Sequence, residues 1–248
     1  MYNLAISLSS SAAVFLAAWF ALGGSDYRPV AVIVAPLVFF GLNYYLSKRT
    51  IKKVEALMEH VGKELQNQRF DKAIRLLKGG YRLGDWQFFV KPQLRAQIGT
   101  IYYLTREDEN AFTYLKDGFA KHWVAMGMLA VIYMKKKQKA LMVETFEKAV
   151  KATPKESLIW ALYAYCMLKE GERDKALDIL GRGLKKLPDD DKLKANQLAV
   201  ANKERMKMKG YGDLWTQFYL EKAPPVGQKV PHYMQALAQG GRRRIIRR

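Results

Sequence analysis

The sequence has few of the residues on which disulfide and metal chemistry depend. It contains one cysteine, Cys166, which excludes an intramolecular disulfide. A single thiol fits a reducing compartment but does not require one. The three histidines, His60, His122 and His232, are far apart and match no metal-ligand spacing. We therefore expect no metal site.

Motifs for nucleotide binding and covalent catalysis are also lacking. No glycine pair is followed by the lysine and the serine or threonine of a phosphate-binding loop. No serine lies in a nucleophile elbow, and the carboxylates are scattered along the chain. We predict that the protein is not an enzyme and has no cofactor and no small-molecule substrate.

Charge is nearly absent from residues 1–47, which contain only Asp26 and Arg28 as charged side chains. On either side of these charges lie the apolar runs 4–22 and 30–46. As helices they would be roughly 28 Å and 26 Å long, close to the ~30 Å hydrocarbon core of a bilayer. We predict a transmembrane helical hairpin over residues 1–50. A signal peptide would need a basic start, which the sequence lacks, and a soluble helix pair would not be apolar on all sides.

Basic residues directly after the second run predict the orientation of the hairpin. Lys48, Arg49, Lys52 and Lys53 follow it, and such residues favour the cytoplasmic side. We expect a multi-pass protein of the inner (cytoplasmic) membrane with its C-terminal part in the cytoplasm. Alanines at four-residue spacing in the first run would permit close helix approach, although alanine is common in such helices: Ala13, Ala17 and Ala21.

A period of 34 residues relates two later parts of the chain. Phe146, Ala149 and Pro154 recur in phase as Leu180, Gly183 and Pro188. Large, small and proline positions held in phase indicate a helical repeat.

This pattern resembles the tetratricopeptide repeat, a helix–turn–helix unit. The best match is unit 157–190, with Trp160, Ala164, Ala176, Leu180, Gly183 and Pro188. Unit 123–156 matches through Ala130, Tyr133, Phe146, Ala149 and Pro154. Two further units are expected at about 92–122, through Gly99 and Leu115, and at about 54–87, through Ala73 and Leu77. The resemblance implies a solenoid over residues 51–190, because no unit buries its apolar face alone.

The predicted fold is all-α: a two-helix transmembrane hairpin, then a tetratricopeptide-like α-solenoid with capping helices over residues 191–222. A basic tail follows over residues 223–248. One of Asp189, Asp190 and Asp191 is expected to cap the next helix by accepting its free N–H groups. A divalent-ion site is the less favoured interpretation of these three carboxylates.

In this family the first helix of each unit lines a concave groove. The resemblance assigns eight residues of this chain to that groove: Val124, Gly127, Val131, Met134, Leu158, Ala161, Tyr165 and Leu168. They lack the lysine and asparagine with which chaperone-binding members clamp a terminal carboxylate. An apolar groove suits an amphipathic helix or an apolar peptide as its protein partner. The alternative is that the chain's own capping helices or tail fill it, since exposed apolar surface seldom stays uncovered.

Basic residues next to the hairpin and in the tail suggest contact with anionic lipids. The predicted membrane-surface residues are Lys48, Arg49, Lys52, Lys53, Arg242, Arg243, Arg244, Arg247 and Arg248. Nucleic acid is the less favoured partner, because the sequence shows no basic motif interleaved with aromatic residues.

These features predict a membrane-anchored cytoplasmic scaffold or adaptor that assembles protein partners at the inner membrane. The alternative is a basic membrane-associated nucleic-acid-binding protein. In architecture alone, two spans followed by repeats are similar to the inner-membrane repeat component of Pel-type exopolysaccharide export systems. That similarity implies an assembly role in an envelope or polysaccharide-export complex.

Overall fold

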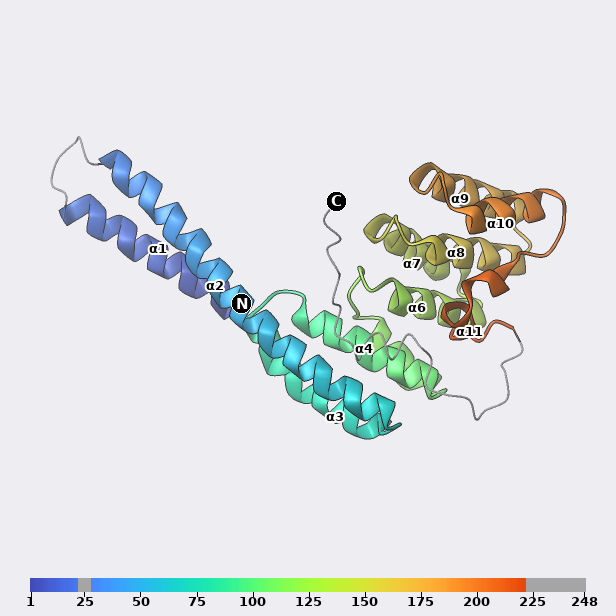
Figure 1. Cartoon of the computed structure of the whole chain (residues 1–248), viewed down its shortest axis with the longest axis horizontal. Coiled ribbons are helices and arrows are strands. Elements are labelled where there is room, and N and C mark those ends of the chain that lie inside the picture. The colour runs from blue at the N-terminus through green and yellow to red at the C-terminus, as the bar shows by residue number, and fades with distance from the viewer. Residues whose placement is uncertain (22–27, 222–248) are drawn as a thin grey trace.

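The fold is a helical hairpin that projects from a stack of helix pairs (Figure 1). The computed structural model describes residues 1–21 and 28–221. Within these residues there are helices and connecting turns but no strand, and the all-α prediction is confirmed.

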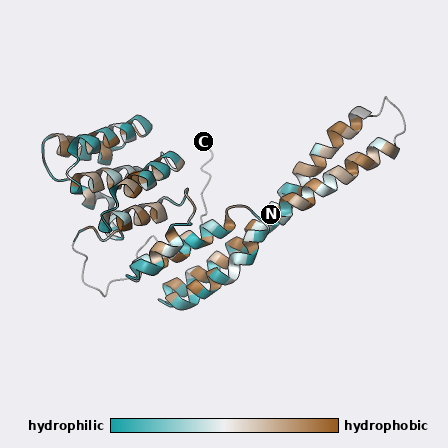
Figure 2. Ribbon diagram, turned by 180° about the vertical axis from the view of Figure 1, so that it is seen from behind, coloured by the Kyte–Doolittle hydropathy of each residue, from teal (hydrophilic) through white to brown (hydrophobic). Residues whose placement is uncertain are grey.

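The hairpin consists of α1 (Tyr2–Ala21) and the first part of α2 (Arg28–Gln66). The Ser11 hydroxyl donates a hydrogen bond to the carbonyl of Ala35 at 2.7 Å, and Ala31 and Ala35 are buried between the helices. Ala13 and Ala17 are exposed instead, so the close approach of the helices does not involve these two alanines. Figure 2 shows that the hairpin is mostly hydrophobic along its length.

Helix α2 joins the hairpin to the repeats without a break. Its 39 residues make it about 58 Å long, nearly twice the ~30 Å core of a bilayer. The expected domain boundary at residue 50 lies inside this helix. The second half of α2 contacts α3 (Phe70–Gly79), so the two form the helix pair of the range in which the first unit is expected.

A small polar joint ties the start of α1 to two other parts of the chain. The Asn3 side chain donates hydrogen bonds to Thr50 Oγ1 at 3.1 Å and to Gln87 Oε1 at 3.2 Å. Asn3 and Thr50 are buried. The joint therefore sets the start of α1 level with Thr50 of α2 and against the linker that precedes α4.

Each of the four expected repeat ranges contains a pair of helices. After α2 and α3 comes the short 3-10 helix η2 (Gly80–Asp85). The following pairs are α4 (Val90–Leu104) with α5 (Asp108–Leu115), α6 (Trp123–Lys135) with α7 (Lys139–Ala152), and α8 (Ser157–Lys169) with α9 (Arg173–Lys186).

Small residues lie where these helices approach each other. Ala164 and Ala176 are fully buried, and a Cβ atom on Gly183 would lie 3.0 Å from Trp160 Cγ. Real Cβ atoms rarely make contacts that short. The small positions of the repeat pattern therefore permit these crossings, as the sequence predicts.

The end of the stack differs in part from the expected capping helices. Helix α10 (Asp191–Ala201) begins after Asp190, whose carboxylate accepts the Leu193 N–H at 2.8 Å, as a cap does. Between Ala201 and residue 221, where the description ends, the helical segments are the short η3 (Met208–Tyr211) and α11 (Asp213–Thr216). The basic tail lies outside the described residues.

The start of α6 depends on a neutral histidine. The N–H of Ala125 donates to Nδ1 of His122 at 3.1 Å, and the Gln97 amide lies 3.1 Å from Nε2. Burial lowers the pKa of His122 to about 4, from an ordinary value of 6.5. The folded chain therefore takes up this proton at lower pH than the unfolded chain does.

Acid is expected to weaken the fold through His122. Because the folded pKa is the lower one, this contribution to stability is complete above pH 6.5 and is lost as the pH falls toward 4. The loss amounts to as much as about 3 kcal/mol. His122→Asn keeps a capping acceptor but cannot titrate. Urea unfolding at pH 7 and pH 4.5 should show a smaller pH effect in the variant, and an equal effect would contradict this assignment.

Candidate functional site

The candidate site is the face formed by α6 and α8, the most apolar helices of the repeat region. From Val124 to Tyr133 every residue of α6 is buried, and α8 is buried from Leu158 to Ala164. Neither helix has a polar face, so one side can pack on α7 and α9 while the other needs a second cover. That second side is the groove predicted from the repeat pattern.

A segment near the C-terminus supplies the cover. Residues 206–220, which we name the strap, follow α10 and contain η3 and α11. Five of its large apolar side chains are buried to at least nine-tenths, namely those of Met206, Met208, Tyr211, Trp215 and Phe218. The strap is thus part of the hydrophobic core despite its scarcity of regular structure.

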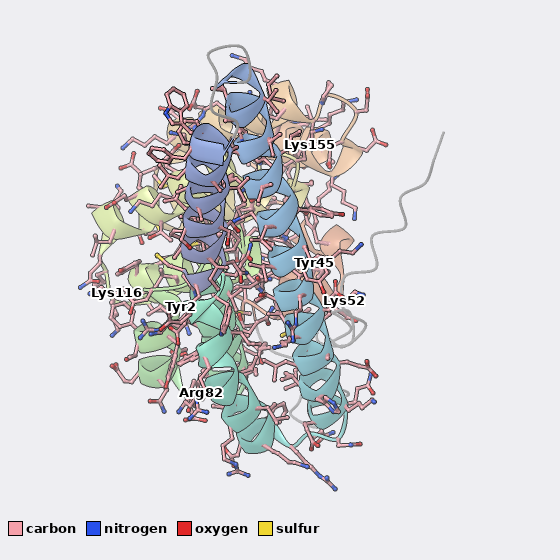
Figure 3. All side chains as sticks on the ribbon, turned by 90° about the vertical axis from the view of Figure 1, so that its left-hand side faces the viewer. Tyr2, Tyr45, Lys52, Arg82, Lys116 and Lys155 are labelled. Atoms are coloured by element: carbon pink, nitrogen blue, oxygen red, sulfur yellow. The ribbon has the colours of Figure 1, made fainter. Side chains whose placement is uncertain are left out.

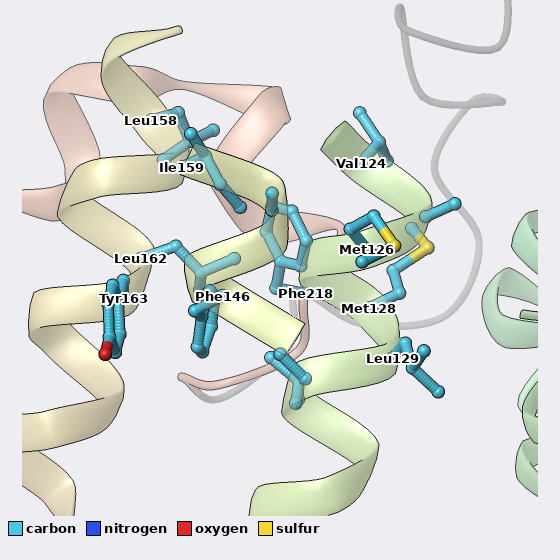
Figure 4. Close-up of a cluster of buried hydrophobic side chains, with 14 of the residues drawn as sticks. Val124, Met126, Met128, Leu129, Phe146, Leu158, Ile159, Leu162, Tyr163 and Phe218 are labelled. Carbon is cyan, nitrogen blue, oxygen red and sulfur yellow. The ribbon is translucent and has the colours of Figure 1, made fainter. Parts of the chain in front are cut away.

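Two aromatic side chains of the strap fill the groove. Phe218 is fully buried between α6 and α8, and its ring lies against Gly127, where a Cβ atom would be 2.9 Å from Phe218 Cε1 (Figure 4). Trp215 meets Tyr165 edge to face, with ring centroids 4.8 Å apart. Glycine at position 127 therefore leaves the space that the Phe218 ring occupies.

Polar contacts fix the direction of the strap. Its path begins at α10, where Asn196 Oδ1 accepts the N–H of Lys207 at 2.6 Å. The Tyr211 hydroxyl lies 2.9 Å from Ser157 Oγ at the start of α8. At α4 the Tyr103 hydroxyl donates to the carbonyl of Phe218 at 2.7 Å. The strap thus contacts α10, α8, α6 and α4 in turn, in reverse chain order.

The far end of the strap is held by aromatic and cationic contacts. The Tyr219 hydroxyl donates to the carbonyl of Leu104 at 3.2 Å, and its ring stacks on Tyr103. The Arg106 guanidinium lies 3.2 Å from the centroid of the Tyr219 ring. Burial raises the pKa of Tyr103, so its hydroxyl keeps the proton that it donates.

The structure brings the predicted groove residues together on neighbouring helices, but most are covered. Val131 and Ala161 are fully buried, and Val124, Gly127 and Leu158 are also buried. The three partly exposed members are Met134, Tyr165 and Leu168. The contacts with Phe218 and Trp215 correspond to the alternative interpretation, in which the chain fills its own groove. Contact of these groove residues with a protein partner stays a prediction, and it requires the strap to move aside.

The predicted basic residues next to the hairpin are all exposed on α2: Lys48, Arg49, Lys52 and Lys53. We name these four residues the basic collar. The Lys48 ammonium lies 5.8 Å from the centroid of the Tyr44 ring. Figure 3 shows Lys52 close to Tyr45 on α2, with Tyr2 on the neighbouring helix. The tail arginines, Arg242, Arg243, Arg244, Arg247 and Arg248, lie outside the described residues.

A second, open hollow of about 620 Å³ lies between α7 and α9. Lysines contribute much of its lining, namely Lys148, Lys151, Lys185 and Lys186. Arg182, also at this hollow, donates two hydrogen bonds to the Glu147 carboxylate, at 2.8 and 2.7 Å. These bonds hold the pKa of Glu147 below its usual value. The guanidinium is therefore already engaged, and the hollow offers flexible lysines rather than a preformed anion site.

The described residues show no arrangement typical of catalysis. They contain no group of three or more histidine, cysteine or acidic residues that could hold a metal. Cys166 is fully buried, and burial raises the pKa of its thiol. A buried protonated thiol is a poor nucleophile.

The sequence offered the capping helices as the alternative occupant of the groove but did not identify which residues would fill it. Tyr211, Trp215 and Phe218 were expected in a capping helix. The available signal was the absence of a polar face on 123–135 and 157–169, which requires cover on both sides. The pattern does not show which aromatic residue of the chain supplies that cover.

Comparison with known families supports the repeat assignment. Family models of the tetratricopeptide repeat match residues 125–156 and 143–197. The matched segments include α6 to α9 and most of α10. No curated protein matches the chain. The tetratricopeptide repeats indicate a scaffold for protein–protein interaction, and proteins of this family are typically not catalysts.

Proposed function

We propose that the protein is an integral membrane scaffold that recruits protein partners to the cytoplasmic face of the inner membrane. The observation that carries this proposal is helix α2, which joins an outward-facing apolar hairpin directly to the first repeat. Two spans followed by a repeat domain are similar in layout to the repeat component of polysaccharide-export systems. The proposed partners are therefore proteins of an envelope complex, such as polysaccharide-export machinery.

The exposure of the hairpin supports insertion into a bilayer. Only 11% of the most apolar window of each helix is buried. Large apolar side chains point outward along both helices, among them Phe20, which is 77% exposed, and Leu37, which is 66% exposed. A core helix of a soluble protein would be mostly buried, and exposed apolar surface of this extent calls for lipid or a partner.

The basic collar supports the orientation. Its four cations lie within about two turns of the end of the apolar run of α2 and are exposed. Such residues favour the cytoplasmic side and interact with anionic headgroups at about 1 kcal/mol each. The repeats, which continue from the same helix, then lie in the cytoplasm.

Membrane extraction tests the anchor. The full-length protein should stay in the membrane pellet after alkaline washing, whereas a variant lacking residues 1–47 should be released. A C-terminal epitope should be digested by protease in inside-out vesicles and protected in right-side-out vesicles. Release of the full-length protein by alkali would refute the anchor, and the opposite protection pattern would refute the orientation.

The groove between the first helices is the proposed partner site, and the strap is its internal occupant. A partner that binds there must displace Trp215 and Phe218. Tyr165, which is half-buried at the strap edge, is a suitable position for a photoreactive side chain. Val131 is unsuitable for a charge substitution because it is fully buried, so aspartate there would test folding and not binding.

Crosslinking in native membranes tests the partner site. A photoreactive residue at position 165 should form intermolecular crosslinks, and Phe218→Ala should increase their yield because it weakens the competing strap. The matched control is position 140, an exposed residue at the start of α7. Crosslinks that stay within the chain in both backgrounds would refute the groove as partner site. Co-purifying nucleic acid with steep salt dependence would favour the alternative function.

A further inference from the structure

Outside the groove, an exposed aromatic cluster lies on the linker between η2 and α4. Three large side chains of this linker project into solvent: Trp86, Phe88 and Phe89, which are 42%, 45% and 62% exposed. We name residues 86–89 the aromatic loop. Arg82 and Lys91, both exposed, flank it on either side. Three neighbouring exposed aromatic residues are unusual on a surface that faces only water.

The aromatic loop is attached to the first residues of the hairpin. The Asn3 N–H donates to the carbonyl of Trp86 at 3.3 Å, and the Tyr2 ring meets the Trp86 ring edge to face, with centroids 5.4 Å apart. The Asn3 side chain also donates to Gln87 Oε1. The loop is therefore held beside the start of α1.

These contacts fix the depth of the loop relative to the hairpin. Asn3 also reaches Thr50, and Thr50 lies within the basic collar of α2. The loop is thus level with the collar, at the point where the apolar part of α2 ends. In a bilayer this level is the headgroup region, where tryptophan is enriched.

Phe89, at the end of the loop, combines a left-handed backbone conformation with an exposed ring. Phe89 has a φ of 67°, in the left-handed region, although it is not glycine. For a residue with a Cβ atom this conformation costs roughly 1–2 kcal/mol. Its ring remains the most exposed of the three and contacts Phe119 at 5.3 Å between centroids. Five other non-glycine residues share this backbone conformation, so the exposure of the Phe89 ring, and not its φ, is what indicates a surface that receives it.

We propose that the aromatic loop is a second membrane contact, which inserts Trp86, Phe88 and Phe89 into the interfacial region of the bilayer. This inference rests on the proposed membrane anchor. With the hairpin it gives the repeat domain two points of attachment. The lipid surface is the occupant that fits, because the loop is continuous with the hairpin and level with the collar. Two attachment points hold the solenoid at a set orientation to the membrane.

Site-specific fluorescence quenching in vesicles tests the proposal. Full-length Phe88→Cys protein is labelled with an environment-sensitive fluorophore and reconstituted in phosphatidylcholine vesicles containing nitroxide lipid. Cys166 is fully buried, so labelling is directed to the introduced thiol. Leu37→Cys reports on the hairpin, and Ala140→Cys is the control at an exposed position of the repeats. Phe89→Cys serves as the reporter if circular dichroism shows that Phe88→Cys is unfolded.

The three labels separate the loop from the anchor. We expect a headgroup-proximal nitroxide to reduce the fluorescence at position 88, a chain-end nitroxide to reduce it at position 37, and neither to affect position 140. A label at position 88 that behaves like that at position 140, while position 37 is quenched, would overturn the loop contact and leave the anchor standing. A lack of quenching at position 37 would overturn both.

Discussion

Phe218→Ala is expected to lower the free energy of unfolding by about 3–5 kcal/mol, the usual cost of truncating a buried phenylalanine. Phe218 is fully buried between α6 and α8, against Gly127, which has no side chain to fill the space. The variant would leave a cavity lined by apolar helices that have no polar side to expose. A loss of this size is a large fraction of the stability of an ordinary domain.

Leu214→Ala is the matched control for this prediction. Leu214 lies in the same strap but is 39% exposed, so its truncation should change stability by less than that of Phe218. Urea unfolding, followed by circular dichroism in a mild detergent, measures both variants. Equal small effects at positions 214 and 218 would show that the strap is not docked in the groove.

Gly99→Ala is expected to destabilise the protein by about 1–3 kcal/mol, the typical cost of overpacking a core. Gly99 lies on α4 where α5 crosses it. A Cβ atom there would be 2.7 Å from Leu115 Cγ and 2.9 Å from the Leu115 backbone nitrogen. The side chain could rotate away, but the backbone nitrogen can move only with the whole of α5. The helices must separate, and the buried contacts around them weaken.

Gly181→Ala is expected to act in the opposite direction. Gly181 lies within α9, and the nearest atom to an added Cβ is Gln197 Nε2, at an ordinary 3.5 Å. Alanine then gains about 0.5–1 kcal/mol from its higher helix propensity. Thermal unfolding of both variants under one condition tests the pair. A stabilised Gly99→Ala protein would contradict the close crossing of α4 and α5.

Local chemistry made several features of this protein predictable. Asp190 caps α10, and α7 and α9 end shortly before Pro154 and Pro188. Both features depend on residues only a few positions apart in the chain, so they can be predicted from the sequence. The in-phase small residues predicted the crossings at Ala176 and Gly183, because a 34-residue repeat places equivalent positions at equivalent contacts. The apolar character of residues 4–22 and 30–46 is likewise a property of composition.

Other features depend on contacts between segments far apart in the chain. The sequence by itself determined the all-α fold class, the phase of the repeat pattern and an apolar groove, since these follow from the helical period and from the 34-residue repeat. Only the tertiary structure decided that Phe218 fills this groove and that Trp86 lies beside Tyr2. These contacts join residues more than 80 positions apart, as do the hydrogen bonds from Asn3 to Gln87 and from Tyr103 to Phe218. Such pairings depend on the path of the whole chain, and no local pattern encodes that path.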